Sequence, residues 1–269
     1  MAVFDDGGGP ALYVGGSFSE AGGLPAHGVA RWDGAAWSAL GGFGSDGVDG
    51  EVFGLAVFDD GSGPALFVGG NFDSAGGLSA QNLAAWDGEA WRVVGGAAFQ
   101  DPQNYAYVRG LHVWDDGSGP ALYVIGRFSE VGGVAAEKIA RWDGGSWTAL
   151  DGPLAQGLGW YGPVSLLGLA EGPSRALFVG GLLGSAGGLA SSGVARWRCR
   201  EAGIFEDGFE SGDASGWTHE TESSSCVGVA GAQESPWLQK WHAGVSPPVR
   251  ESSLTGSTLA GAPSCECIA

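Results

Sequence analysis

The sequence has 269 residues, of which 53 are glycine and 44% are hydrophobic, and its formal net charge is −18. This hydrophobic share excludes a disordered chain, and glycines without a three-residue period exclude collagen, so a turn-rich all-β protein remains. The negative charge argues against nucleic acid or an anionic membrane surface as a partner, because basic side chains supply affinity for both. No apolar run approaches the roughly 18 residues of a membrane-spanning helix, so we expect no membrane insertion.

Two short motifs recur along the chain with one common period. The motif Ala-Leu-Tyr/Phe-Val begins at positions 11, 65, 121 and 176, which are 54, 56 and 55 residues apart. A tryptophan, followed by Asp-Gly in the first three copies, occurs at positions 32, 86, 142 and 197 with the same spacing. Two anchors that share a spacing predict a repeat of about 55 residues. We set the repeats at about 1–42, 43–96, 97–152 and 153–200.

Each repeat carries the pattern of four strands, which is clearest in the second repeat. Residues 52–58 and 65–72 are apolar runs joined by Asp-Asp-Gly-Ser-Gly-Pro, which is typical of a hairpin. Residues 83–86 and 90–94 flank the tight turn Asp87-Gly88 and predict a second hairpin. A single sheet of this size leaves its faces uncovered, so we expect the repeats to pack on one another.

The glycine pair after the second strand and the two tryptophans around the last turn resemble the kelch motif. The glycine pairs are Gly15-Gly16, Gly69-Gly70 and Gly180-Gly181, and the tryptophan pairs are Trp32/Trp37, Trp86/Trp91 and Trp142/Trp147. The resemblance covers about residues 2–198, is closer still to bacterial repeat proteins built on LYVGGxFxxAGGxxxxxIARWDGxxWxxL, and implies a β-propeller of blade-like sheets.

The first and last repeats depart from this pattern. The first repeat enters midway through its first strand, and the fourth has Arg198-Cys199 in place of Asp-Gly and lacks the second tryptophan. We therefore expect an incomplete last blade and a piece of a larger propeller. The alternative is a small four-bladed ring.

The repeat register ends after Arg200. Residues 204–217 (IFEDGFESGDASGW) resemble a segment near the C-terminal ends of many secreted bacterial proteins, which implies an extracellular or cell-surface location. Met1 is not followed by a signal-peptide pattern. Residues 218–269 show no period, so we expect 201–269 to be largely irregular. The pairing of the four cysteines, Cys199, Cys226, Cys265 and Cys267, stays open.

Several patterns were weighed as chemical sites. The aspartate pairs at 5–6, 59–60 and 115–116 suit calcium, but Pro-Ala stands where a closing carboxylate is needed, so we interpret them as solvated hairpin turns. The histidines have no zinc-ligand spacing, and neither a Gly-x-Ser-x-Gly elbow nor the Tyr, Cys and His set of the kelch-type copper oxidase is recognisable. The paired tryptophans fit packing between sheets better than sugar binding. We expect no metal, no cofactor and no catalytic site.

The four repeats differ most in sequence in the loops at one end of the predicted sheets. The turns at the other end are nearly identical, whereas the second loops and the crossovers between repeats differ. Loops held by a rigid scaffold commonly carry binding residues. The candidate ligand-binding residues are Phe99, Asp101, Asn104, Tyr105, Trp160, Tyr161, His27, Gln81 and Glu137.

The sequence thus predicts a non-catalytic, exported module that binds protein or polysaccharide through this variable face. One alternative is an extracellular carbohydrate-active enzyme that uses acidic residues such as Asp101 and Glu137. Another is a truncated gene product without a function of its own.

Overall fold

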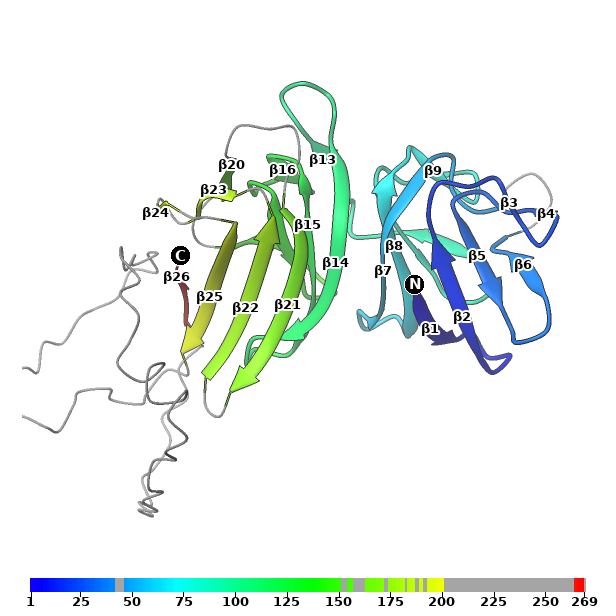
Figure 1. Ribbon diagram of the computed structural model, residues 1–269, viewed down its shortest axis with the longest axis horizontal. Coiled ribbons are helices and arrows are strands. Elements are labelled where there is room, and N and C mark those ends of the chain that lie inside the picture. Colours follow the sequence, from blue (N-terminus) through cyan, green and yellow to red (C-terminus); the bar gives the residue numbers. More distant parts are fainter. Residues whose placement is uncertain are drawn as a thin grey trace, which may run out of the picture.

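A computed structural model describes residues 1–41, 46–150, 154–156, 163–171, 174–181, 183–186, 189–190, 193–200 and 264–268. In this part of the chain the regular structure consists of β-strands, and the strands pair antiparallel in several small sheets. The predicted all-β fold is confirmed. Figure 1 shows the sheets standing one after another along the longest axis. No helix among the described residues is long and apolar enough to cross a membrane.

Each of the first three repeats forms one four-stranded sheet, and the fourth repeat supplies three strands of a fourth sheet, with the strands in chain order throughout. The first sheet contains β1 (Ala2–Asp5), β2 (Pro10–Gly15), β5 (Val29–Trp32) and β6 (Trp37–Ala39). The second contains β7 (Glu51–Asp59), β8 (Pro64–Asn71), β11 (Leu83–Trp86) and β12 (Trp91–Val93). The third contains β14 (Tyr107–Asp115), β15 (Pro120–Arg127), β18 (Ile139–Trp142) and β19 (Trp147–Ala149). The fourth contains β21 (Pro163–Glu171), β22 (Ser174–Gly181), β25 (Val194–Arg200) and β26 (Ser264–Ile268).

The fourth sheet takes its outer strand from the C-terminal part of the chain. Strand β26 pairs with β25, and the register sets Cys265 opposite Cys199. We expected 201–269 to be largely irregular; Ser264–Ile268 forms a strand that was not predicted, and 201–263 lies outside the described residues. In the described part of the chain the fourth repeat supplies β21, β22 and β25 but no outer strand, so β25 presents an edge that can accept a strand from elsewhere. Because the strand SCECI follows no repeat motif, the periodicity could not predict it.

Short strands occupy the loop between the second and third strands of each repeat. They form the hairpins β3 (Glu20–Ala21) with β4 (Leu24–Pro25), β9 (Ser74–Ala75) with β10 (Leu78–Ser79), β16 (Glu130–Val131) with β17 (Val134–Ala135), and β23 (Leu183–Ala186) with β24 (Leu189–Ala190). The crossover strands β13 (Phe99–Gln100) and β20 (Leu154–Gln156) extend the last two hairpins. The turn in the second repeat has Gly76 at φ +56° and Gly77 at φ +80°, a conformation that favours glycine.

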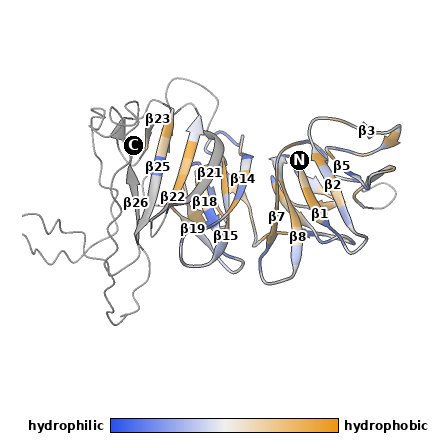
Figure 2. Cartoon of the chain, turned by 60° about the horizontal axis from the view of Figure 1, so that its bottom comes forward, coloured by the Kyte–Doolittle hydropathy of each residue, from blue (hydrophilic) through white to orange (hydrophobic). Residues whose placement is uncertain are grey.

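The hydrophobic core lies between the sheets. One cluster fills the space between the first and second sheets around Leu66, a second lies between the second and third around Leu122, and a third lies beyond it around Leu177. These three leucines hold the same position in successive repeats. Figure 2 shows hydrophobic residues along the strands of these sheets. Because each cluster draws on two sheets, the repeats stabilise one another, as the sequence predicts.

The paired tryptophans belong to these clusters. The rings of Trp86 and Trp91 lie 5.4 Å apart, and both side chains are buried in the cluster between the first and second sheets. The indole N–H of Trp91 also donates a hydrogen bond of 3.1 Å to the Leu40 carbonyl of the preceding repeat. The pair Trp32 and Trp37 in the first sheet is half-buried. The predicted packing role is confirmed for the second and third repeats, where all four tryptophans are buried.

The row of described sheets is open. The first strands of successive sheets contact one another, β1 with β7, β7 with β14, and β14 with β21. The first and fourth sheets stand at opposite ends of the row in Figure 1. The four-bladed ring considered from the sequence is therefore not observed in the described part of the chain.

Candidate functional site

The two ends of the sheets differ in character. At one end, the hairpin turns of the first and second repeats meet the Trp-Asp-Gly turns of the second and third repeats. A Cβ on Gly88 would lie 2.7 Å from the carbonyl oxygen of Asp6, and a Cβ on Gly144 would lie even closer to that of Asp60. The turns at this end have nearly the same sequence in successive repeats, so we call it the turn end.

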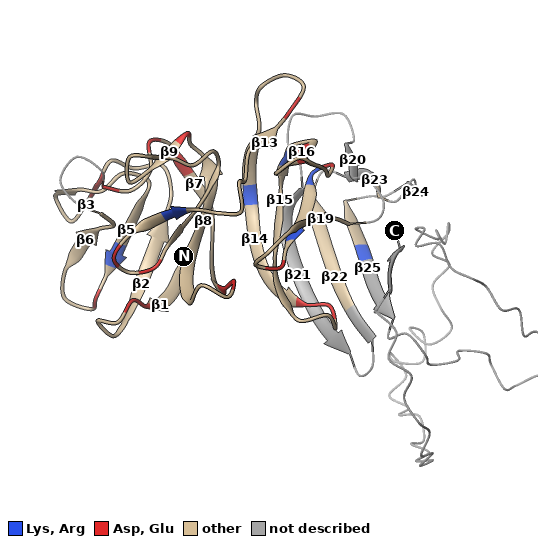
Figure 3. Ribbon diagram, turned by 180° about the vertical axis from the view of Figure 1, so that it is seen from behind, with Lys and Arg blue, Asp and Glu red and all other residues tan. Residues whose placement is uncertain are grey.

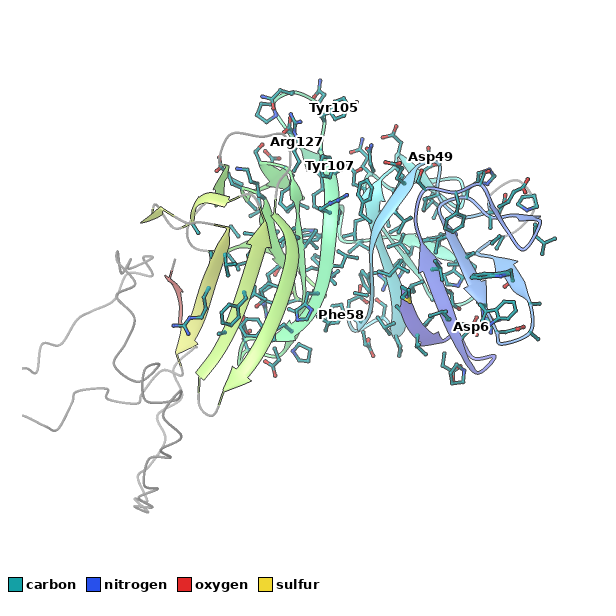
Figure 4. The ribbon with its side chains drawn as sticks, viewed as in Figure 1. Asp6, Asp49, Phe58, Tyr105, Tyr107 and Arg127 are labelled. Carbon is teal, nitrogen blue, oxygen red and sulfur yellow. The ribbon has the colours of Figure 1, made fainter. Side chains whose placement is uncertain are left out.

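The opposite end carries the short hairpins and the crossovers between repeats, and we call it the crossover face. Figure 4 shows Asp6 and Phe58 at the turn end, and Asp49, Tyr105 and Tyr107 at the crossover face. The predicted separation of constant turns from variable loops is therefore confirmed. Figure 3 shows that aspartate and glutamate lie mainly in turns and loops, whereas lysine and arginine are few.

At the turn end, the first aspartate of each pair stabilises its own hairpin turn by accepting backbone hydrogen bonds. A side-chain oxygen of Asp59 accepts hydrogen bonds from the backbone N–H groups of Gly61 and Gly63, at 2.9 and 3.1 Å. Asp5 and Asp115 make the equivalent bonds in the first and third repeats. Such a side-chain cap stabilises a glycine-rich turn without a metal ion.

The second aspartate of each pair accepts one backbone N–H of the turn and is also paired with an arginine. In the third repeat, Asp116 accepts a hydrogen bond from the Tyr123 hydroxyl at 3.0 Å and lies 3.3 Å from the Arg141 guanidinium. Burial alone would raise the pKa of Asp116, but hydrogen bonds from Ser118 and Tyr123 and the charge of Arg141 outweigh it and lower that pKa. Burial and the neighbouring carboxylate together raise the pKa of Tyr123. The first repeat has the same arrangement, with Asp6, Tyr13 and Arg31.

The second repeat builds this ion pair from a different strand. Its third strand has Ala85 where Arg31 and Arg141 stand in the other repeats. Arg92, the cross-strand partner of Ala85 on β12, supplies the guanidinium to Asp60 at 2.8 Å. A phenylalanine, Phe67, replaces the tyrosine in this repeat.

These contacts correct the interpretation of the aspartate pairs as fully solvated turns. The side chains of Asp6, Asp60 and Asp116 are at most 12% exposed, and each is neutralised by an arginine. Among the residues with described side chains, no three of His, Cys, Asp and Glu gather to hold a metal ion. The sequence signal for these ion pairs is the arginine before the Trp-Asp-Gly tryptophan in the first and third repeats.

On the crossover face, a β-bulge at the start of the first strand positions one side chain per repeat. The pairing register passes over Phe53 in β7 and Arg109 in β14. The Arg109 guanidinium lies over the Phe53 ring, 4.8 Å from its centroid, and the Tyr107 ring meets Phe53 edge-on at 6.1 Å. All three side chains are half-buried. Bulges often turn a side chain toward a functional site, so we call Phe53, Tyr107 and Arg109 the bulge cluster.

Arg109 differs from the other arginines whose ion pairs are described. It has no carboxylate partner among the described side chains, whereas Arg31, Arg92, Arg127 and Arg141 each form an ion pair. The ring of Phe53 stabilises its charge only in part, because an exposed cation–π contact contributes little. The Arg109 guanidinium is therefore available to donate hydrogen bonds to ligand oxygens. It is one of few basic groups in a chain whose net charge is −18.

The crossover loop above the bulge cluster is fixed by a second arginine. Arg127 bonds to the Asp101 carboxylate at 2.9 Å and to the Gln103 side-chain oxygen at 2.9 Å. Burial would raise the pKa of Asp101, but the hydrogen bond from Arg127 outweighs it and lowers that pKa. Asn104 turns the chain with φ +56°, and Tyr105 follows with 65% of its surface exposed, 5.8 Å from Arg127. The loop thus presents Tyr105 to solvent.

The structure corrects one predicted site residue. Phe99, a candidate ligand-binding residue, is only 5% exposed and packs edge-on against Phe128 and Trp147. Its strand β13 pairs with β16 and carries the ring into the core between the second and third sheets. The crossover has no strand period, so no sequence pattern predicts this pairing. Asp101 is also a poor contact residue, because Arg127 already holds its carboxylate.

The remaining predicted residues are spread over several repeats. His27, Gln81 and Glu137 hold the same position in the first three repeats, and Gln81 and Glu137 are exposed. The His27 imidazole lies 3.5 Å from the Asp46 carboxylate, and Glu137 lies 3.8 Å from Lys138. Trp160 and Tyr161 lie outside the described residues. The structure therefore places Asn104 and Tyr105 near the bulge cluster, whose three members the sequence analysis missed.

Comparison with protein-family models, with curated proteins and with solved structures finds no match to this chain.

Proposed function

We propose that this chain is a non-catalytic, exported binding module of the kelch-like β-propeller type, which binds a polysaccharide on its crossover face. The observation that carries the proposal is the bulge cluster, in which Arg109 lies over the Phe53 ring, Tyr107 meets the same ring edge-on, and Arg109 has no carboxylate partner among the described residues. Exposed Tyr105 stands next to this cluster on the same face.

The arrangement of the sheets supports the assignment to a propeller. Each sheet is a four-stranded meander, and the first strands β1, β7, β14 and β21 contact one another in succession, as the inner strands of propeller blades do. The repeated contacts of Gly88 with Asp6 and of Gly144 with Asp60 give successive sheets the same relative placement. Uniform placement of successive repeats is what a closed circular array requires.

The chemistry of the bulge cluster favours a polysaccharide over a strongly acidic ligand. Aromatic rings offer flat apolar surface with a polar edge, and arginine offers several N–H donors in a rigid fork for hydroxyl or carboxylate oxygens. The net charge of −18 repels long polyanions. A neutral or sparsely charged polysaccharide therefore fits best, and a protein ligand is the other outcome of a binding screen.

The position of the acidic residues supports a non-catalytic role. The enzyme alternative used Asp101 with Glu137, but the Asp101 carboxylate is bound to Arg127 and its pKa is lowered. A general acid requires a carboxyl group whose pKa is raised toward neutrality. Asp101 thus has the opposite character from the one that a glycosidase acid needs.

The test is a screen against a panel of neutral and uronate-containing polysaccharides, followed by titration calorimetry on the ligand found. We expect Arg109→Ala and Phe53→Ala each to weaken binding by about tenfold or more. The matched control is Glu89→Ala, because Glu89 is exposed in the Trp-Asp-Gly turn at the turn end. Binding that survives both crossover-face variants, or that Glu89→Ala weakens equally, would rule out this site.

A further inference from the structure

The third strand of the fourth repeat continues through the position where the other repeats turn. Strand β25 has seven residues, Val194–Arg200, whereas β5, β11 and β18 have four each. In the first three repeats an Asp-Gly turn follows this strand, and its glycine has φ between +102° and +110°. Cys199 holds the place of that glycine, and a side chain disfavours this backbone angle. The tight turn is therefore replaced by extended chain as far as Arg200.

Strand β26 lacks the two features that hold the outer strands of the second and third sheets. Those strands, β12 and β19, come directly after a tight turn and begin with a buried tryptophan, Trp91 or Trp147. The sequence of β26, SCECI, contains no tryptophan, and residues 201–263 separate it from β25. Pairing segments so far apart costs conformational entropy that grows with the length of the loop between them. A covalent link between β25 and β26 would offset this cost.

The register of β25 and β26 sets complementary residues opposite one another. The two strands lie side by side (Figure 1), with Cys199 opposite Cys265 and Arg198 opposite Glu266. Opposite charges directly across two strands stabilise the pairing. Directly opposed residues of antiparallel strands have Cα atoms about 4.5 or 5.5 Å apart, and disulfides span Cα separations of about 4.4–6.8 Å. The backbone thus brings Cys199 and Cys265 within the range of a disulfide bond.

The third cysteine with a described backbone position, Cys267, is less well placed for either partner. It lies opposite Trp197, which makes it a diagonal neighbour of Cys199, at about 7–8 Å in antiparallel sheets. Cα atoms more than about 7 Å apart cannot be bridged without moving the backbone. Cys265 and Cys267 are two residues apart on one strand, so their Cβ atoms are about 6.6 Å apart, against about 3.5–4.5 Å in a disulfide. Cys226 lies outside the described residues.

We propose that Cys199 and Cys265 form a disulfide bond that fastens β26 to the edge of the fourth sheet. The thiolate of one cysteine attacks a disulfide oxidant, and the thiolate of the other then displaces the oxidant's remaining sulfur. The two thiols lose two protons and two electrons, and the oxidant leaves as two thiols. The bond closes a long loop and restricts the unfolded chain, so it stabilises the pairing of β26 with β25. The inference goes beyond the proposed ligand site and uses none of its residues.

The first test is a peptide map of the full chain after incubation with oxidised and reduced glutathione. Free thiols are alkylated, and trypsin and glutamyl endopeptidase then cut the chain without reduction. Cleavage after Glu266 separates Cys265 from Cys267, so each cysteine falls on a peptide of its own. We expect mass spectrometry to find the dipeptide Cys199-Arg200 linked to the peptide that ends at Glu266. Non-reducing electrophoresis should place the linked chain at the single-chain mass of 27.1 kDa.

Amide hydrogen exchange gives a second measurement. Reduction should speed exchange in β26 by about tenfold or more, and exchange in β8 of the second sheet should not change, which shows that the chain stays folded. Cys199→Ser and Cys265→Ser should each lose the linked peptide, and β26 should exchange as it does in the reduced chain. The matched control is Cys267→Ser, which alters a cysteine of the same strand and should keep both the link and the slow exchange.

Three results would overturn the proposal. One is a map in which Cys199 is alkylated or is linked to Cys226 or Cys267. Another is a link between Cys199 and Cys265 that occurs only in a disulfide-bonded dimer. The third is exchange in β26 that reduction leaves unchanged. None of them bears on polysaccharide binding at Arg109, so the two proposals can fail separately.

Discussion

Arg92 donates two hydrogen bonds to the carboxylate of Asp60, at 2.8 and 2.9 Å, from a strand that carries no arginine in the neighbouring sheets. In those sheets the guanidinium comes from the third strand, at the position that Ala85 occupies in the second. The arginine that neutralises the buried aspartate thus stands at either of two positions that face each other across neighbouring strands, those of Ala85 and Arg92. The chemistry of the site is retained although the position of the arginine is not.

This exchange predicts a rescue experiment in the second repeat. Arg92→Ser should cost about 3 kcal/mol of unfolding free energy, because Asp60 is left buried without its counter-charge. Adding Ala85→Arg should recover most of that loss, since the register places Ala85 directly opposite Arg92. Urea unfolding of the two variants measures both values. A double variant no more stable than Arg92→Ser would show that the two positions are not interchangeable.

The lowered pKa values of Asp6, Asp60 and Asp116 predict the direction of acid unfolding. A carboxyl whose folded-state pKa lies below its unfolded value stabilises the fold fully above that unfolded value, near pH 4. This stability is lost as the pH falls through the folded-state pKa. We expect the urea midpoint to fall steeply below about pH 4. Asp116→Asn should be less stable at neutral pH and should show a shallower fall in acid, and an unchanged acid profile would contradict the assignment.

A pair of glycine substitutions isolates the contact between successive repeats. Gly34 and Gly144 have φ of +103° and +102°, so alanine is strained by about 1–2 kcal/mol at either position. Only at Gly144 would the new Cβ also strike the backbone of Asp60. Gly144→Ala should therefore cost about 2 kcal/mol more than Gly34→Ala. Equal losses in unfolding free energy would mean that successive sheets are less closely packed at this turn.

Calcium should have little effect on stability. The carboxylates that could bind it already cap the turns or pair with arginine, as Asp59 and Asp60 do in the second repeat. We expect melts in millimolar calcium and in EDTA to agree within about 2 °C, because an ion that does not bind the folded state cannot raise its stability. A rise of about 10 °C or more would point to a calcium site and would require Arg92 to release Asp60.

Much of the fold follows from the periodicity of the sequence. The motif around Ala65 places the second strand, and the turn at Asp87-Gly88 places the third and fourth, so the strands of the second repeat were predicted closely. Strand β26 was not predicted, because its pairing with β25 joins segments that are far apart in the sequence and share no motif. Local patterns report on hairpins, whereas long-range pairing depends on which edges the folded chain leaves free.

The candidate site was predicted only in part. Tyr105, a candidate ligand-binding residue, is exposed, but Phe53 and Arg109 lie in strands whose sequences read as ordinary apolar runs. A bulge shifts one residue out of register without leaving a sequence signature, so their convergence could not be inferred. Phe99 was misplaced for the converse reason, since a crossover without strand period still formed a strand.

Because the core lies between the sheets, the sheets cannot unfold independently of one another. None of the three clusters belongs to one sheet alone, so removing any sheet strips its neighbour of half a core. The unfolding free energy then depends mainly on the interfaces between neighbouring sheets, as in a one-dimensional lattice. The sheets at the two ends of the row have one such interface each and are the least stable. Amide hydrogen exchange should be slowest in β8 and β15, in the middle of the row, and should quicken toward both ends. A chain divided between two repeats would expose an apolar sheet face on each fragment, and neither fragment would be an independent domain.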